Sequence, residues 1–330
     1  MNMSYETKTI IVGKCYEWKA EKWRAALDVA TAAADYAKCH ELRAKAFEYT
    51  VRAAQAEFYR DADGQLRRLE LAPAQQCGME MVSREIPAVL MGGRFQTQFA
   101  TVNADCLAVA RRLVERGETV AVLNMANRQT PGGGVLHGSR AQEEQMFRRS
   151  DYYRFLYQYA DVGEVFGVRV PRDLSGSYPM HRDFGGIFTP NVTVFRDDEK
   201  SGYAFLAKPW RVNFIAVAAM NRPDTVTVNG EELVAPYLVP GIKNKMRTIL
   251  RLALRHGQTS LVLGAFGCGA FRNPPAHTAR LFHEVFTERE FAGAFNRVYF
   301  AVLDDGNAEL HGGNFRHFAS VFGELPMNFI

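Results

Sequence analysis

The spacing of apolar residues divides the chain into an N-terminal helical region and a longer region in which strands and helices alternate. Residues 16–58 contain no glycine or proline. Their large apolar residues recur at loose helical spacing and predict one or two helices: Trp18, Trp23, Leu27, Val29, Tyr36 and Leu42. From about residue 94, the alternation is typical of an α/β domain with a mostly parallel or mixed sheet.

The predicted elements of the second region follow from runs of strand length and stretches of helical spacing. We expect strands over 94–102, 119–125, 212–219, 260–263 and 297–303, and helices over 104–117, 142–159, 242–255, 276–286 and 315–322. Several glycines and prolines in residues 161–198 predict short strands and long loops that wall a pocket. A connector over 73–78 makes residues 1–80 a helical extension that packs on a domain of residues 81–330.

Length and charge narrow the class of protein. The chain has 330 residues, 47% of them hydrophobic, which is enough for a sizeable core. The formal net charge of +4 tolerates an anionic substrate but does not by itself indicate nucleic-acid binding, so we predict none.

The cysteines and histidines favour a protein without disulfides or metal. The five cysteines are scattered and odd in number, which favours a reducing compartment. The histidines show no zinc-binding spacing, so we predict no metal.

Because no apolar run approaches the roughly 20 residues that span a bilayer, we expect a soluble, intracellular protein with no membrane partner. Its expected location is the cytoplasm, or also the nucleus in a eukaryotic cell.

One stretch between a predicted strand and a predicted helix carries the strongest chemical signal. It reads Asn124-Met-Ala-Asn127, then three glycines at 132–134, then Gln142-Glu143-Glu144. Glycine N–H groups near a helix start favour an anion or hydroxyl site. Ser139 and Gln142 fit a capping box. Alone, three glycines are usually a flexible loop and two glutamates a solvated face, but the combination is much more specific.

A second glycine loop, Gly264 to Phe271, has the same context of buried strand, glycines and helix. A tight turn between strand and helix is an equally good interpretation of it alone. Ligands of open α/β sheets bind at the carboxyl ends of strands, so we expect both loops to face one crevice. Neither loop is followed by the Lys-Ser or Lys-Thr of a P-loop, and the second misses the dinucleotide-binding spacing.

Together the two motifs resemble those of the poly(ADP-ribose) glycohydrolases, in particular their microbial branch, over roughly residues 81–330. The resemblance implies a macrodomain-like, three-layer α/β/α fold with a mixed sheet. It implies hydrolysis of the ribose–ribose O-glycosidic bonds of poly(ADP-ribose), with ADP-ribose as product and no metal or redox cofactor. An ADP-ribosylated protein is the other substrate that the resemblance allows.

The resemblance also implies roles for individual residues. Glu144 is expected to protonate the leaving oxygen as general acid, while Glu143 and Asn127 bind the terminal ribose. Phe271 is expected to pack against that ribose. The other implied substrate-binding residues are Gly132, Gly133, Gly134, Val135, Gln142, Gly264, Phe266, Gly267, Cys268, Gly269 and Ala270.

Two of these assignments carry alternatives. Asp105 lies where a macrodomain usually has its adenine-contacting acid, but a helix cap before Leu107 is the slightly favoured interpretation. Cys268 has no evident basic partner, so within its loop we interpret it as a small packing residue rather than a nucleophile.

Two other functions fit the same fold. The chain could remove single ADP-ribose units from a protein side chain or a nucleobase, or it could bind ADP-ribose without hydrolysis. The presence of both Glu143 and Glu144 argues against a pure binder, which does not need the acid.

Overall fold

The computed structural model describes residues 17–73, 78–89, 93–172, 176–304 and 313–330. They form two compact units. The first unit contains the described residues of Met1–Cys77 together with Gln129–Pro179 and Asn191–Arg211. The second contains those of Gly78–Arg128, Met180–Pro190 and Val212–Ile330. The division of the chain at residue 80 stays a prediction.

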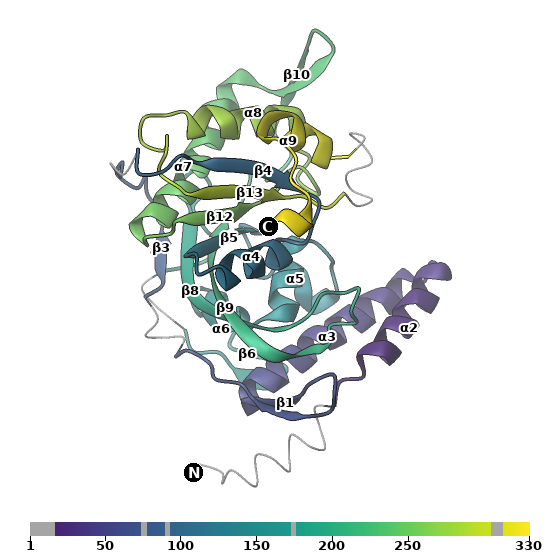
Figure 1. Ribbon diagram of the computed structural model, residues 1–330. Coiled ribbons are helices and arrows are strands. Elements are labelled where there is room, and N and C mark those ends of the chain that lie inside the picture. The colour runs from purple at the N-terminus through teal and green to yellow at the C-terminus, as the bar shows by residue number, and fades with distance from the viewer. Residues whose placement is uncertain (1–16, 74–77, 90–92, 173–175, 305–312) are drawn as a thin grey trace. The chain divides into compact units, whose positions relative to one another are not determined.

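A seven-stranded mixed sheet is the centre of the second unit (Figure 1). Its strand order is β3 (Glu80–Val82), β8 (Gly186–Arg196), β9 (Phe205–Val217), β5 (Val120–Met125), β12 (Ser260–Leu263), β13 (Arg297–Ala301) and β4 (Gln98–Val102). The neighbours from β9 to β4 pair in parallel, whereas β3 pairs antiparallel with β8. The last six residues of β8 and the first seven of β9 belong to the first unit.

Helices cover both faces of this sheet. The apolar residues of α7 (Val239–Arg255), α8 (Pro275–Phe286) and α9 (Phe315–Phe322) form one core with Leu123, Leu263 and Phe300. Helix α4 (Cys106–Glu115) packs on β5, β12 and β13. Because side chains alternate along a strand, Val122 and Val262 face away from that core, toward α4. The predicted three-layer α/β/α arrangement is therefore confirmed.

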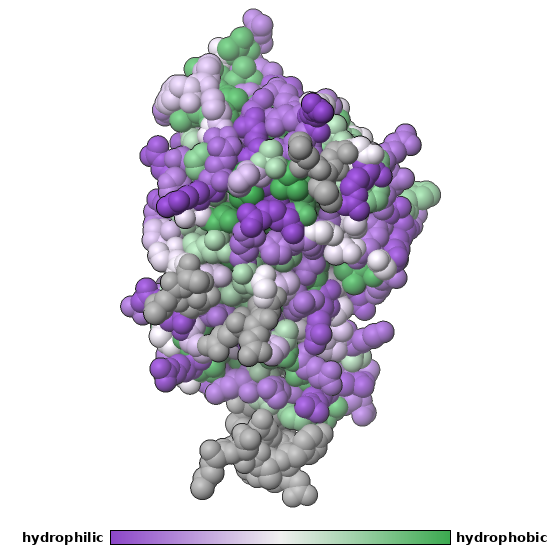
Figure 2. Space-filling view, turned by 90° about the vertical axis from the view of Figure 1, so that its left-hand side faces the viewer, coloured by the Kyte–Doolittle hydropathy of each residue, from purple (hydrophilic) through white to green (hydrophobic). Residues whose placement is uncertain are grey.

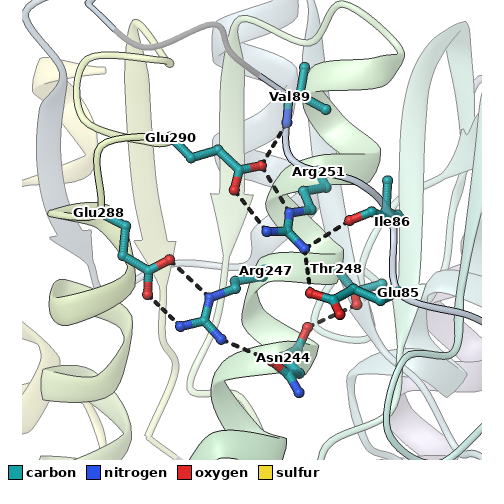
Figure 3. Close-up of polar contacts among 9 residues, drawn as sticks. All are labelled: Glu85, Ile86, Val89, Asn244, Arg247, Thr248, Arg251, Glu288 and Glu290. Atoms are coloured by element: carbon teal, nitrogen blue, oxygen red, sulfur yellow. Dashed lines mark hydrogen bonds and ion pairs between the residues drawn. The ribbon is translucent and has the colours of Figure 1, made fainter.

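Ion pairs fasten α7 to the segments beside it (Figure 3). Arg251 pairs with Glu290 at 2.8 Å and with Glu85 at 3.1 Å, and it donates to the Ile86 carbonyl. One turn earlier, Arg247 pairs with Glu288 at 2.7 Å. The guanidinium groups thus fix one side of α7, while the opposite side packs in the core.

The first unit is built on two long helices, α2 (Ala20–Ala32) and α3 (Tyr36–Ala56), which confirm the predicted N-terminal helices. Arg196 of β8 is fully buried among them. It donates to the carbonyls of Ala46 and Tyr203 and lies 4.2 Å from the ring centre of Trp18. Burial lowers the pKa of this guanidinium to about 9, yet it stays charged at neutral pH.

Shorter elements complete the two units. In the first unit they are β1 (Phe58–Arg60), β2 (Leu66–Arg68), η1 (Val135–His137), α5 (Gln142–Arg149), α6 (Tyr153–Leu156), η2 (Tyr157–Tyr159), β6 (Glu164–Val165) and β7 (Val168–Arg169). In the second unit they are β10 (Thr225–Val228), β11 (Glu231–Val234), η3 (Pro236–Leu238) and η5 (Met327–Phe329).

The predicted helix over 142–159 is wrong in its middle. Ser150 has extended backbone angles and pairs with Val194 of β8 in an isolated bridge. The next residue, Asp151, accepts from the Thr193 amide at 2.8 Å and pairs with Arg154 at 2.9 Å. Pairing with β8 therefore breaks the helical run into α5, α6 and η2.

Other predictions need smaller corrections. Val29 and Tyr36 are 71% and 75% exposed, so they do not belong to the buried stripe of the N-terminal helices. The strand predicted from residue 94 begins at Gln98, and the short strands expected in 161–198 include the eleven-residue β8. The hairpin of β10 and β11 was not predicted, although Asn229-Gly230 is a typical hairpin turn. The connector over 73–78 lies partly outside the described residues.

The surface and the described cysteines add three observations. In the part of the chain that the structure describes, no helix is long and apolar enough to cross a bilayer. On the face shown in Figure 2, hydrophilic residues predominate and apolar ones form smaller patches. The three described cysteines, Cys39, Cys106 and Cys268, are buried and free.

Asp151 makes the stability of the protein depend on pH. Burial raises its pKa from 3.8 to about 6, so the folded state binds the proton more tightly than the unfolded chain. The resulting stability is fully present below pH 3.8 and is lost as pH rises through 6. We expect the free energy of unfolding, relative to Asp151→Asn, to rise by about 2 kcal/mol from pH 7 to pH 4. Urea unfolding of both proteins measures this, and parallel pH curves would contradict it.

Candidate functional site

The first glycine loop and the two glutamates of α5 form a compact cluster in the first unit. Both glutamates lie in the first turn of α5, as predicted, and are 3% and 6% exposed. The Gly132 amide donates to Glu143 Oε1 at 3.0 Å, and the Gly134 amide donates to Glu144 Oε1 at 2.9 Å. The loop therefore orients both carboxyl groups through its backbone.

Glycines let the backbone of this loop pack closely against neighbouring side chains. A Cβ atom on Gly133 would lie 2.4 Å from Glu144 Oε1, and one on Gly132 would lie 2.7 Å from the Phe147 ring. Both residues also have positive φ angles, of +55° and +75°. The glycines thus let the backbone approach the carboxyl groups and the aromatic ring beneath.

The amides of this loop differ from the sequence-based prediction in what they bind. We expected them to form an anion or hydroxyl site, but those of Gly132 and Gly134 bind the chain's own carboxyl groups. The capping box is also wrong, because Ala141 is the N-cap of α5 and makes no side-chain cap. Ser139 instead packs against Gly134, where a Cβ would lie 2.2 Å from its hydroxyl.

Helix α3 holds the loop from behind. The His40 carbonyl lies 2.0 Å from where a Cβ of Gly138 would be, so backbone packs on backbone there. Arg148 of α5 donates to the carbonyls of Ser139 and Arg43, and Thr50 donates to the Arg148 carbonyl at 2.5 Å. These bonds fix α5 and the end of the loop on α3.

Two buried oxygen atoms of this cluster make no hydrogen bond within the described residues: Glu144 Oε2 and the Tyr178 hydroxyl. Such atoms are rare in proteins because an unbonded buried polar group is costly. Burial, followed by the charge of Glu143, raises the pKa of Tyr178 well above its usual value, so the hydroxyl stays protonated near that carboxyl. Sequence patterns did not indicate Tyr178, which lies in an irregular segment.

The remaining predicted residues of the first loop take simpler positions. Val135 begins η1 and is buried, while Gln142 is the first residue of α5. A cavity of about 400 Å³ in the same unit is lined by residues of α3, α6 and β7 and includes none of the predicted site residues.

In the second unit, predicted residues follow the carboxyl ends of two adjacent strands. Asn127 comes two residues after β5, and Gly264 directly follows β12. Asp105 caps α4 by accepting from the amides of Leu107 and Ala108. The cap is therefore present, and the adenine contact of Asp105 stays a prediction.

The second glycine loop exposes backbone donors and buries side chains. Among the described residues, the amides of Gly267, Gly269, Ala270 and Phe271 have no hydrogen-bond acceptor. Gly267 has a φ of +78°, and a Cβ there would lie 2.5 Å from the Asn273 side chain. Free amides on a loop at a strand end suit an anionic ligand.

Asn273 shapes this loop, although the sequence-based interpretation gave it no role. Its side-chain amide donates to the carbonyls of Met220, Gly267 and Phe271. It is only 2% exposed and thus acts as an internal brace that closes the loop.

Phe266 and Cys268 point into the core, whereas Phe271 is partly buried against it. Burial raises the pKa of the Cys268 thiol to about 12, so it is protonated at neutral pH. This agrees with packing rather than with a nucleophile. No group of three or more His, Cys, Asp and Glu residues within the described ranges could hold a metal ion.

Comparisons with known proteins identify the family of the chain. Residues 48–197 match the family model "Microbial-type PARG, catalytic domain", where PARG stands for poly(ADP-ribose) glycohydrolase. No curated protein sequence matches the chain.

Two solved structures have about the same identity to the chain. The poly(ADP-ribose) glycohydrolase of Thermomonospora curvata, bound to the inhibitor ADP-HPD, is 30% identical with a TM-score of 0.64. The match covers 84% of this chain and 98% of that one. The enzyme of Deinococcus radiodurans, in complex with ADP-ribose, is 31% identical with a TM-score of 0.60, over 76% and 98% of the two chains.

Contact between the loop and α3 predicts a large difference between two Gly→Ala variants. Gly138→Ala should lower the free energy of unfolding by about 3 kcal/mol, because the new Cβ meets the His40 carbonyl and φ is +76°. Gly163→Ala is the control, with φ of +66° and no atom within 4 Å, and should cost about 1 kcal/mol. Urea unfolding measures both, and equal losses would contradict the packing argument.

Proposed function

Because this chain belongs to the family of microbial-type poly(ADP-ribose) glycohydrolases, we propose that Glu144 is the acid with which it cleaves its substrate. The chain is a glycohydrolase that hydrolyses poly(ADP-ribose) and releases ADP-ribose, on a macrodomain-like fold. The observation that carries the proposal is how the two oxygen atoms of the Glu144 carboxyl group are bonded. One oxygen is held by the Gly134 amide, and the other is buried and unbonded within the described residues.

Glu144 Oε2 is the oxygen that transfers the proton in this proposal. Cleavage passes through an oxocarbenium-like state, in which the leaving ribose oxygen gains a proton as the glycosidic bond breaks. An acid with one oxygen fixed by a backbone amide presents the other in one direction.

Glu143 and Asn127 position the terminal ribose in this mechanism. Glu143 Oε1 is held by the Gly132 amide, so its carboxyl group can accept hydrogen bonds from ribose hydroxyls without reorienting. Asn127 follows the end of β5, where ligands of α/β sheets bind.

The second loop binds the substrate diphosphate through its free amides. The amides of Gly267, Gly269 and Ala270 offer donors without internal acceptors in the described chain, and Phe271 packs against the ribose. Anion binding by backbone donors needs no metal ion or lysine.

Mono-ADP-ribosylated protein remains the alternative substrate. It would need the same acid and the same ADP-ribose contacts, because only the leaving group differs. Comparing ADP-ribose release from polymer with release from mono-modified protein separates the two.

We infer a cytoplasmic location from the three buried, free cysteines, and cell fractionation tests this.

Glu144→Gln keeps the shape of the side chain and the bond from Gly134 but removes the transferable proton. We expect kcat for ADP-ribose release from polymer to fall by about 10³-fold or more, with an unchanged unfolding midpoint. Glu115→Gln, at an exposed position of α4, is the control and should match the wild type. Undiminished turnover of Glu144→Gln would disprove the role of the acid.

Gly133→Ala should separate activity from stability. The new Cβ would meet Glu144 Oε1 at 2.4 Å, and this atom ends a flexible side chain that can move aside. We expect kcat to fall by about 10²-fold because the acid is displaced by an ångström or more. The stability loss should stay near the roughly 1 kcal/mol of Gly163→Ala. A variant with normal kcat would show that the position of the carboxyl group does not limit the reaction.

A further inference from the structure

Helix α7 carries five cationic side chains, and four of them are ion-paired. Lys243 pairs with Glu284, Arg247 with Glu288, Arg251 with Glu290 and Arg255 with Glu80, at 2.5–2.9 Å. The pairs of Arg247 and Arg251 are visible in Figure 3. The fifth cation is Lys245, and its Nζ atom has no hydrogen-bond partner within the described residues.

A buried lysine without a hydrogen-bond partner, such as Lys245, is unusual in a protein. It is only 3% exposed, and burial lowers its pKa to about 8, so most molecules still carry the charge at pH 7. The nearby Asp183 favours the charged form, whereas the nearby Arg128 opposes it. Arg128 is half-buried, and one of its terminal nitrogen atoms donates to the Met180 carbonyl at 3.3 Å. Asp183 pairs with Arg182 at 3.3 Å, and it bonds to neither Lys245 nor Arg128 within the described residues.

This cluster lies at the edge of the sheet where the strands end. Arg128 directly follows Asn127, three residues after β5. Lys245 is on the face of α7 that also carries Thr248 and Leu252, and these two residues contact Gly186 at the start of β8. Gly186 in turn lies beside Val217, the last residue of β9. The cluster therefore lies at the β8 and β9 side of β5, whereas the second glycine loop follows β12 on the other side.

A polymer substrate carries a diphosphate on each side of the bond that is cleaved. In the proposed function, on which this step rests, the terminal diphosphate binds the loop after β12 and the terminal ribose binds Asn127 after β5. Beyond the scissile bond, the leaving group is the ribose of the next unit, which carries a diphosphate of its own. Neighbouring strands lie about 4.8 Å apart. Arg128 follows β5, and Lys245 lies toward β9 and β8, so the cluster is on the side of the ribose that is away from the loop after β12.

We propose that Lys245 and Arg128 form a second anion site, which binds a phosphate of the ADP-ribose unit next to the scissile bond. A phosphate supplies the acceptor that Lys245 lacks, and its negative charge attracts both cations. The site would make the enzyme prefer polymer over substrates whose leaving group has no phosphate.

Two substrates test the proposal. The first is poly(ADP-ribose), and the second is an aryl glycoside of ADP-ribose, in which a phosphate-free phenol replaces the rest of the polymer. For Lys245→Met, we expect KM for polymer to rise about tenfold at unchanged kcat, and both constants for the aryl glycoside to stay as in the wild type. Arg128→Gln should act in the same direction.

Lys243→Met is the matched control, since it removes one positive charge from the same helix outside the cluster. It should leave KM for polymer unchanged. Lys245→Met should unfold at the same or a higher urea concentration than the wild type, because it removes a buried charge without a partner.

The outcomes separate this site from the proposed function. Equal losses with both substrates would place the lysine at the terminal unit and overturn the proposal, as would an unchanged KM for polymer in both variants. If the wild type released ADP-ribose from neither substrate, the proposed function itself would fail.

Discussion

Two backbone hydrogen bonds are the constraint on which the site depends. The amides of Gly132 and Gly134 donate to Glu143 and Glu144, and these bonds orient both carboxyl groups through the backbone. A side chain on Gly133 would occupy the place of a Glu144 oxygen. The three glycines are therefore required by the carboxyl groups they hold, and not only by the turn they make.

The rest of the first unit keeps this arrangement rigid. The loop rests on α3 through the close contact of Gly138 with His40, and Arg148 ties α5 to the same helix. Arg148 is fully buried, and two of its three guanidinium nitrogen atoms donate to the carbonyls of Arg43 and Ser139. These bonds hold α5 and the end of the loop beside the two carboxyl groups. Precise placement of this kind is what an acid acting on a single oxygen atom needs.

Local pattern predicted much of the fold, and its largest failure came from a contact between distant parts of the chain. The bounds of β12 and α9 agree with the sequence-based prediction, because a buried strand and an amphipathic helix have clear periods. The helix over 142–159 failed at Ser150, where pairing with a strand more than forty residues away outweighs helical periodicity. The types and spacing of the site residues could be recognised in the sequence. The hydrogen-bond partners of their polar atoms could not. No local pattern shows that the glycine amides bind glutamates of the same chain, or that Asn273 braces the second loop.

The two glycine loops illustrate that similar sequences can place charge in opposite ways. In the first loop, backbone donors are bonded to two acidic side chains, so the loop contributes carboxyl groups. In the second, the donors of Gly267, Gly269 and Ala270 have no acceptor in the described chain, so the loop contributes partial positive charge. A loop whose amides are bonded to carboxyl groups presents acids, whereas a loop with unpaired amides suits an anion. The two loops therefore offer different chemistry, and neither could replace the other.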